Sequence, residues 1–90
     1  MAGMNAEEIR HYIAGEVRAE VARQAKPAGS AAACLRKSKQ AFSDKWRGKR
    51  DYQPQELLAL ANWLEVDVRQ FLPPDYVLMM VRREPAELAS

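Results

Sequence analysis

The sequence of 90 residues has one cysteine, one histidine and no long apolar run, and each shortage excludes a class of protein. Cys34 cannot form an internal disulfide, and Cys34 with His11 supplies too few ligands for a structural zinc site. Only four Gly and five Pro, against 48% hydrophobic residues, exclude a collagen-like or largely disordered chain. The apolar runs are also far shorter than the roughly 20 residues that a membrane-spanning helix needs.

Groups that carry catalysis are equally scarce. The sequence shows no Ser/His/Asp combination, no metal-ligating cluster and no glycine-rich phosphate loop, and His11 has no partner in sequence. We therefore expect neither an enzyme nor a cofactor nor a small-molecule substrate. The first residues lack the basic stretch and apolar block of a secretion signal, so we expect a cytoplasmic protein with no membrane partner. The length suits a single core.

What the chain does have is positive charge concentrated in one place. The net charge is only +2, but residues 26–50 hold eight Lys or Arg against the single acid Asp44, a net of +7. The flanking residues 1–25 and 51–90 carry net charges of −1 and −4. A basic centre between acidic flanks is typical of a module that places one face on phosphate. An ordinary solvated face is the other interpretation of this charge run.

Apolar periodicity predicts an all-α domain of about five helices over residues 1–73. A long amphipathic helix is expected at residues 5–25, followed by two short helices within residues 30–47. Two further helices are predicted at residues 54–65 and 68–72. Residues 74–90 form a C-terminal extension.

Two serines mark the starts of the short helices. Ser30 is expected to cap the first of them, and Ser38 the second, which runs over residues 39–47. Phe42 and Trp46 lie one turn apart on this second helix and are predicted to face the core. Two short helices joined by about two residues form a helix-turn-helix, whose second helix fits the major groove of DNA.

The second helix carries polar groups on the side opposite Phe42 and Trp46. Gln suits adenine, Lys and Arg suit guanine or phosphate, and Asp suits cytosine. An alternative role for Asp44 is to orient Lys39, Lys45 or Arg47 by ion pairing. The residues predicted to meet base edges are Lys39, Gln40, Ser43, Asp44 and Arg47.

The segment from Ser38 to Arg50, with residues 55–67 after it, resembles the lambda-repressor-like (Cro/XRE-type) family of helix-turn-helix DNA-binding domains. The two share a serine that opens the recognition helix, and one turn later an apolar residue followed by a second serine. They also share a Gly-Lys-Arg turn after that helix and the pattern Glu-Leu-Leu-x-x-Ala-x-x-Leu-x-Val in the next one. The resemblance covers roughly residues 28–73. The resemblance implies a lambda-repressor-like helical bundle. It also implies a transcriptional regulator that binds double-stranded DNA, of the small phage or mobile-element type.

The same resemblance places the contacts with the DNA backbone on both sides of the recognition helix. The residues expected to contact phosphate are Ser30, Arg36, Lys37, Ser38, Lys45, Lys49 and Arg50. The chain departs from the family pattern at two places. Arg36 and Lys37 stand where the family usually has glycine and an apolar residue, and Ala31 stands where a glutamine often reaches phosphate.

Residues 76–81 form an uncharged apolar run that fits either a strand or a buried helical turn. One interpretation is that this run packs on the first helix. The favoured one is self-association into a homodimer that sets two recognition helices about 34 Å apart. A protein-interaction module of the antirepressor or antitoxin kind, using the same run, is the alternative to DNA binding. The residues concerned are Tyr76, Val77, Leu78, Met79, Met80 and Val81.

Overall fold

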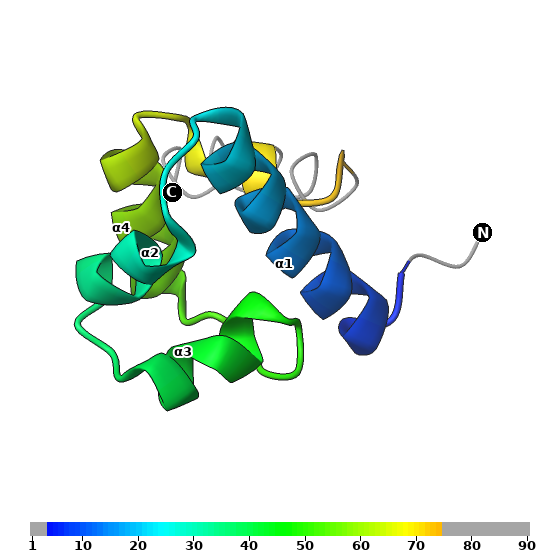
Figure 1. The fold of residues 1–90 in the computed structure, drawn as a ribbon. Helices are drawn as coiled ribbons and strands as arrows, with labels where there is room; N and C mark the ends of the chain where they lie inside the picture. The colour runs from blue at the N-terminus through cyan, green and yellow to red at the C-terminus, as the bar shows by residue number, and fades with distance from the viewer. Residues whose placement is uncertain (1–3, 75–90) are drawn as a thin grey trace, which may run out of the picture.

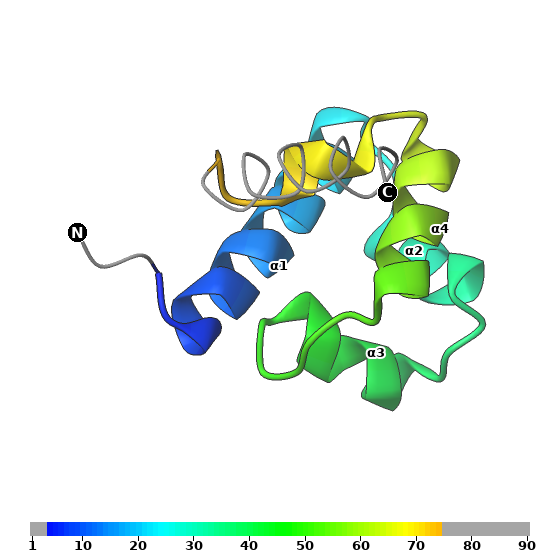
Figure 2. The ribbon, with the colours of Figure 1, turned by 180° about the vertical axis from the view of Figure 1, so that it is seen from behind.

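Four α-helices and one 3-10 helix make up the computed structural model, which describes residues 4–74 and contains no strand in that range. The described part is therefore all-helical, as the sequence predicts. Figures 1 and 2 show α3 at one end of the bundle and η1 between α1 and α4 at the other. The elements are α1 (Ala6–Arg23), α2 (Ala28–Cys34), α3 (Lys39–Trp46), α4 (Pro54–Leu64) and η1 (Val68–Phe71).

Local signals start and stop α1. The Asn5 side chain accepts a hydrogen bond from the Glu8 N–H at 2.8 Å, and the Glu8 carboxylate accepts one from the Asn5 N–H at 2.9 Å. This reciprocal capping box satisfies two amides that a helix start leaves without partners. At the other end Ala25 has a φ of 57°, and the Lys26 N–H donates to the Val21 carbonyl at 3.1 Å. This left-handed stop ends α1 at Arg23, before the predicted residue 25.

The start of α2 differs from the sequence-based expectation. Ser30 does not cap this helix, because α2 already begins at Ala28 and its N-cap position is Pro27, which makes no side-chain cap hydrogen bond. Pro27 is extended, with φ −66° and ψ 141°, and its carbonyl accepts the Ser30 N–H at 3.0 Å. The proline thus sets the helix start two residues before the serine, and Ser30 lies half-buried in the first turn.

The core lies between α1, α4 and η1 and reaches out to α3. Leu60, Leu64 and Phe71 are among its most deeply buried side chains. Phe42 of α3 is also buried, and Trp46 packs against the same cluster with its ring centroid 5.5 Å from that of Phe42. The predicted inward orientation of these two aromatic residues is confirmed. Their burial fixes which side of α3 faces outward.

A buried carboxylate ties α1 to η1. Glu20 is 5% exposed and accepts hydrogen bonds from the side chains of Gln24 at 2.8 Å and Gln70 at 2.6 Å, and it also pairs with Arg23. The Gln24 hydrogen bond is the largest cause that lowers the pKa of Glu20, against the opposing effect of burial. A buried charge is tolerated when hydrogen bonds replace its hydration, so Glu20 anchors both elements.

Candidate functional site

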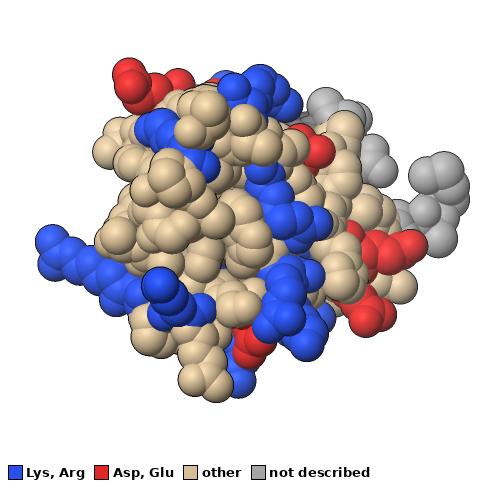
Figure 3. Space-filling view, viewed as in Figure 1, with Lys and Arg blue, Asp and Glu red and all other residues tan. Residues whose placement is uncertain are grey.

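The basic surface predicted from the sequence lies on α3 and the turns at both of its ends. Figure 3 shows Lys and Arg side chains on the lower part of this side of the molecule, where Figure 1 places α3, and further ones above them. Ser43 and Asp44 are half-buried, and the other members of the surface are exposed. We call this surface the α3 face; it consists of Arg36, Lys37, Ser38, Lys39, Gln40, Ser43, Asp44, Arg47, Lys49 and Arg50.

Contacts at both ends hold α3 in place. The Ser38 hydroxyl caps the helix by accepting the Ala41 N–H at 3.2 Å, as predicted. At the other end Gly48 has a φ of 84°, which glycine tolerates. The Arg18 guanidinium of α1 donates to the Trp46 carbonyl at 2.6 Å. The last turn of α3 is therefore fixed to α1, and its outward groups are carried on a rigid support.

The turn between α2 and α3 holds an arginine in an unusual backbone conformation. Arg36 has a φ of 55°, in the left-handed region that glycine favours. Its N–H donates to the Ala33 carbonyl at 3.1 Å, and the Lys37 N–H donates to the Ala32 carbonyl at 3.1 Å. Arginine thus makes the helix-ending turn that glycine usually makes, at a conformational cost of about 1–2 kcal/mol.

Replacing Arg36 should therefore separate the conformation of the turn from its charge. We expect Arg36→Gly to raise the free energy of unfolding by about 0.5–1 kcal/mol, because glycine relieves the left-handed strain but loses more chain entropy. Arg36→Ala removes the same charge and keeps the strain, so it is the matched control. Urea denaturation of the two variants measures the difference. Equal stability of the two variants would contradict a strained turn.

Asp44 lies among the arginines of the α3 face. Its carboxylate is 4.0 Å from Arg47 and 3.7 Å from Arg50, and its backbone carbonyl accepts the Lys49 N–H at 2.8 Å. Of the three partners predicted for it, the structure pairs Asp44 with Arg47 and adds Arg50, which the sequence did not indicate. Ion pairs this exposed add little stability. They place the Asp44 carboxylate between two guanidinium groups of the α3 face.

Lys45 is placed differently from the other predicted phosphate contacts. Its side chain is only 12% exposed, and its ammonium lies 2.6 Å from both carboxylate oxygens of Glu56 on α4. The position of Lys45 on the helix, next to the partly buried Trp46, turns it toward α4 instead of outward. Lys45 therefore acts inside the fold, which corrects the sequence-based expectation.

Glu56 belongs to the site although the sequence pattern did not single it out. It is 6% exposed, accepts the Gln53 N–H at 2.7 Å and lies 3.7 Å from the Lys37 ammonium. Burial acts to raise the pKa of Glu56, but the hydrogen bonds and charges of Lys45, Gln53 and Lys37 leave that pKa below its usual value. One carboxylate thus joins α4, α3 and the α2–α3 turn. Its position three residues after the N-cap Gln53 was the available signal, a capping box.

The dimerisation residues expected at 76–81 lie outside the described residues. Within residues 4–74, no three His, Cys, Asp or Glu side chains come together in a way that could hold a metal ion. None of the described helices is both long and apolar enough to cross a membrane.

Comparison with known proteins adds no relative to this picture. No family model, no curated protein and no solved structure matches the chain. The interpretation of the α3 face therefore depends on its own residues and their geometry.

Proposed function

We propose that this chain is a sequence-specific transcriptional regulator that binds double-stranded DNA through a lambda-repressor-like helix-turn-helix made of α2 and α3. The observation that carries the proposal is the α3 face, a capped and anchored helix whose outward side chains are polar and flanked by cations. An α-helix with its side chains is about 10–12 Å across, and the major groove of B-DNA is about 12 Å wide. One such helix fits the groove with its first turns at the base edges.

The side chains of α3 divide into two roles in this proposal. Gln40 can pair with adenine, and Lys39 and Arg47 with guanine, because their donors and acceptors match those base edges. The Ser43 hydroxyl can both donate and accept a hydrogen bond, so it can pair with either purine. Asp44 acts mainly through Arg47, whose guanidinium lies beside it.

The cations at the two ends of α3 supply the contacts with the DNA backbone. Arg36 and Lys37 precede the helix, and Lys49 and Arg50 follow it, all four exposed. Phosphate contacts of this kind orient a protein on the duplex without reading its sequence. The acidic residues elsewhere in the chain favour a single orientation, with the α3 face toward DNA.

Alanine variants test this division of roles. A preferred duplex is first selected from a random-sequence library with the full chain, and affinities are then measured for the selected and random duplexes. Gln40→Ala and Arg47→Ala should weaken binding to the selected duplex about 10- to 100-fold more than binding to random DNA. Lys49→Ala should weaken both about equally, because it removes a phosphate contact.

Arg69→Ala is the matched control, because it removes one arginine from η1, an element that contacts α1 and α4 and lies away from α3. It should leave both affinities almost unchanged. Equal losses on both duplexes for Gln40, Arg47 and Lys49 variants would contradict base reading by α3. Failure to retain any duplex at low salt would favour the protein-interaction alternative.

A further inference from the structure

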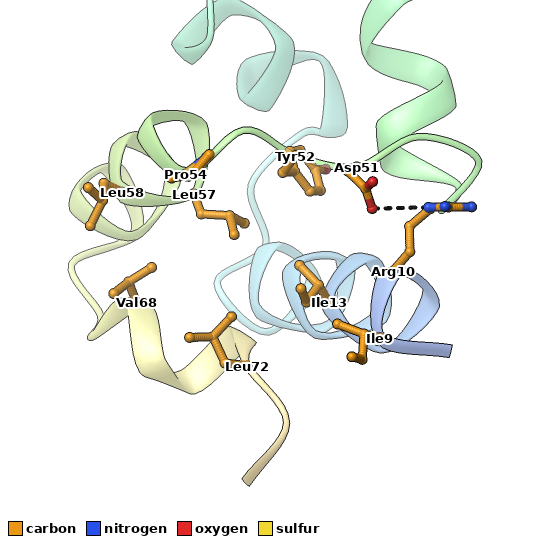
Figure 4. Close-up of a pocket in the computed structure, with 10 residues that line it drawn as sticks. All are labelled: Ile9, Arg10, Ile13, Asp51, Tyr52, Pro54, Leu57, Leu58, Val68 and Leu72. Atoms are coloured by element: carbon orange, nitrogen blue, oxygen red, sulfur yellow. Dashed lines mark hydrogen bonds and ion pairs between the residues drawn. The ribbon is translucent and has the colours of Figure 1, made fainter. Parts of the chain in front are cut away.

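An apolar groove lies on the side of the molecule where α1, α4 and η1 meet. Figure 4 shows Ile9 and Ile13 of α1 facing Leu57 and Leu58 of α4, with Leu72 beside them just after η1. The groove has a volume of about 330 Å³. We call it the α1–α4 groove. None of the residues that line it belongs to the α3 face.

The rim of the groove exposes apolar surface to solvent. Leu58 is 57% exposed, the largest exposure of any large hydrophobic side chain among residues 4–74. One end of the groove is closed by an ion pair between Arg10 and Asp51, whose atoms lie 3.0 Å apart. Apolar area left in water costs about 25 cal/mol per Å², so an apolar segment that covers this groove would be stabilising.

We propose that residues 76–81 of the same chain occupy the α1–α4 groove. Leu72 lines the groove and precedes the apolar run by only a few residues, a contour length of about 14 Å. The run contains no charged side chain, which suits a groove with an apolar lining. In a strand or a helix about half of its six side chains face one way. The groove has room for a few side chains of this kind.

The position of the run in the sequence favours occupation of the groove by the run of the same chain over occupation by the run of a second copy. A segment tethered this closely has an effective concentration in the millimolar range, which a second copy matches only at a similar protein concentration. The assignment selects the first of the two interpretations that the sequence left open, packing against the first helix. It also leaves the α3 face uncovered, so that each chain presents one recognition helix.

Serine replacement of residues 76–81 in the full-length chain tests the proposal, with Leu88→Ser as the control in the same tail. We expect the serine variant to raise the unfolding equilibrium constant about tenfold or more, at every protein concentration used. Leu58→Ser should raise that constant about fivefold in the natural chain, because the tail covers Leu58. The same substitution should have almost no effect in the serine variant, which gives a non-additive double-mutant cycle.

Two other outcomes would overturn the proposal. An unchanged unfolding constant in the serine variant, with Leu58→Ser also neutral, would mean that the groove does not hold this segment. The second outcome is a natural chain that is dimeric by light scattering and becomes more stable as the protein concentration rises, while the serine variant is monomeric. That result would mean that a second copy of the chain occupies the groove. If the serine variant fails to fold, Leu58→Ser in the natural chain still decides the test. Substitution of a leucine that nothing covers changes the free energy of unfolding very little, whereas substitution of a covered one lowers it.

Discussion

Glu56→Ala is expected to lower the free energy of unfolding by about 3–5 kcal/mol, the largest loss that we predict for a single substitution. The Lys45 ammonium, on a side chain only 12% exposed, would lose the carboxylate that lies 2.6 Å away. The backbone N–H of Gln53 would lose its acceptor as well. A buried charge without a partner carries most of its desolvation cost. Urea denaturation of the full chain measures the change.

A double variant provides the control for this prediction. Replacing both Lys45 and Glu56 with methionine removes the charges together and keeps apolar volume between α3 and α4. Because apolar replacement of a buried pair is often neutral or stabilising, we expect the double variant to recover most of the stability lost in Glu56→Ala. A double variant as unstable as the single one would show that the pair is not the source of the loss.

Affinity for duplex DNA is expected to fall about 100-fold between about 50 and 200 mM salt. Each phosphate neutralised by a cation releases condensed counterions, and the slope of log K against log salt is about −0.9 per contact. About four exposed cations flank α3, which gives a slope of about −3.6. These are Arg36, Lys37, Lys49 and Arg50. Fluorescence anisotropy with a random-sequence duplex measures the slope.

Single variants show which cations contribute to that slope. Lys49→Ala should make the slope shallower by about 0.9, because one phosphate contact is lost. Arg69→Ala removes a charge of the same sign away from α3 and should leave the slope unchanged. A slope near zero for the natural chain, or an equal change for the two variants, would contradict phosphate contacts at the ends of α3.

Features that depend on a few neighbouring residues could be predicted from the sequence. The Asn5 capping box, the Ser38 cap and the left-handed Gly48 follow from short-range hydrogen bonds and backbone sterics. The inward orientation of Phe42 and Trp46 follows from their spacing on one helix. These local signals set the length and the outward side of α3, and with them most of the candidate site.

Features that depend on residues far apart in the sequence, or on two possible start positions for one helix, could not be predicted in the same way. The pairing of Lys45 with Glu56 requires α3 and α4 to meet, which helical periodicity does not reveal. Ser30 was a plausible cap, but Pro27 starts α2 earlier because an extended proline can precede a helix directly. Arg36 takes a left-handed conformation since the helix-ending hydrogen bonds outweigh its strain.

The most direct test of the central claim is protection of guanine N7 from methylation on a duplex selected with the full chain. N7 lies in the major groove, so only a protein that enters this groove shields it. We expect protected guanines within the selected site, and Arg47→Ala should lose protection at one of them. Selection of no duplex, or a duplex whose backbone is shielded while every N7 stays reactive, would contradict insertion of α3 into the major groove.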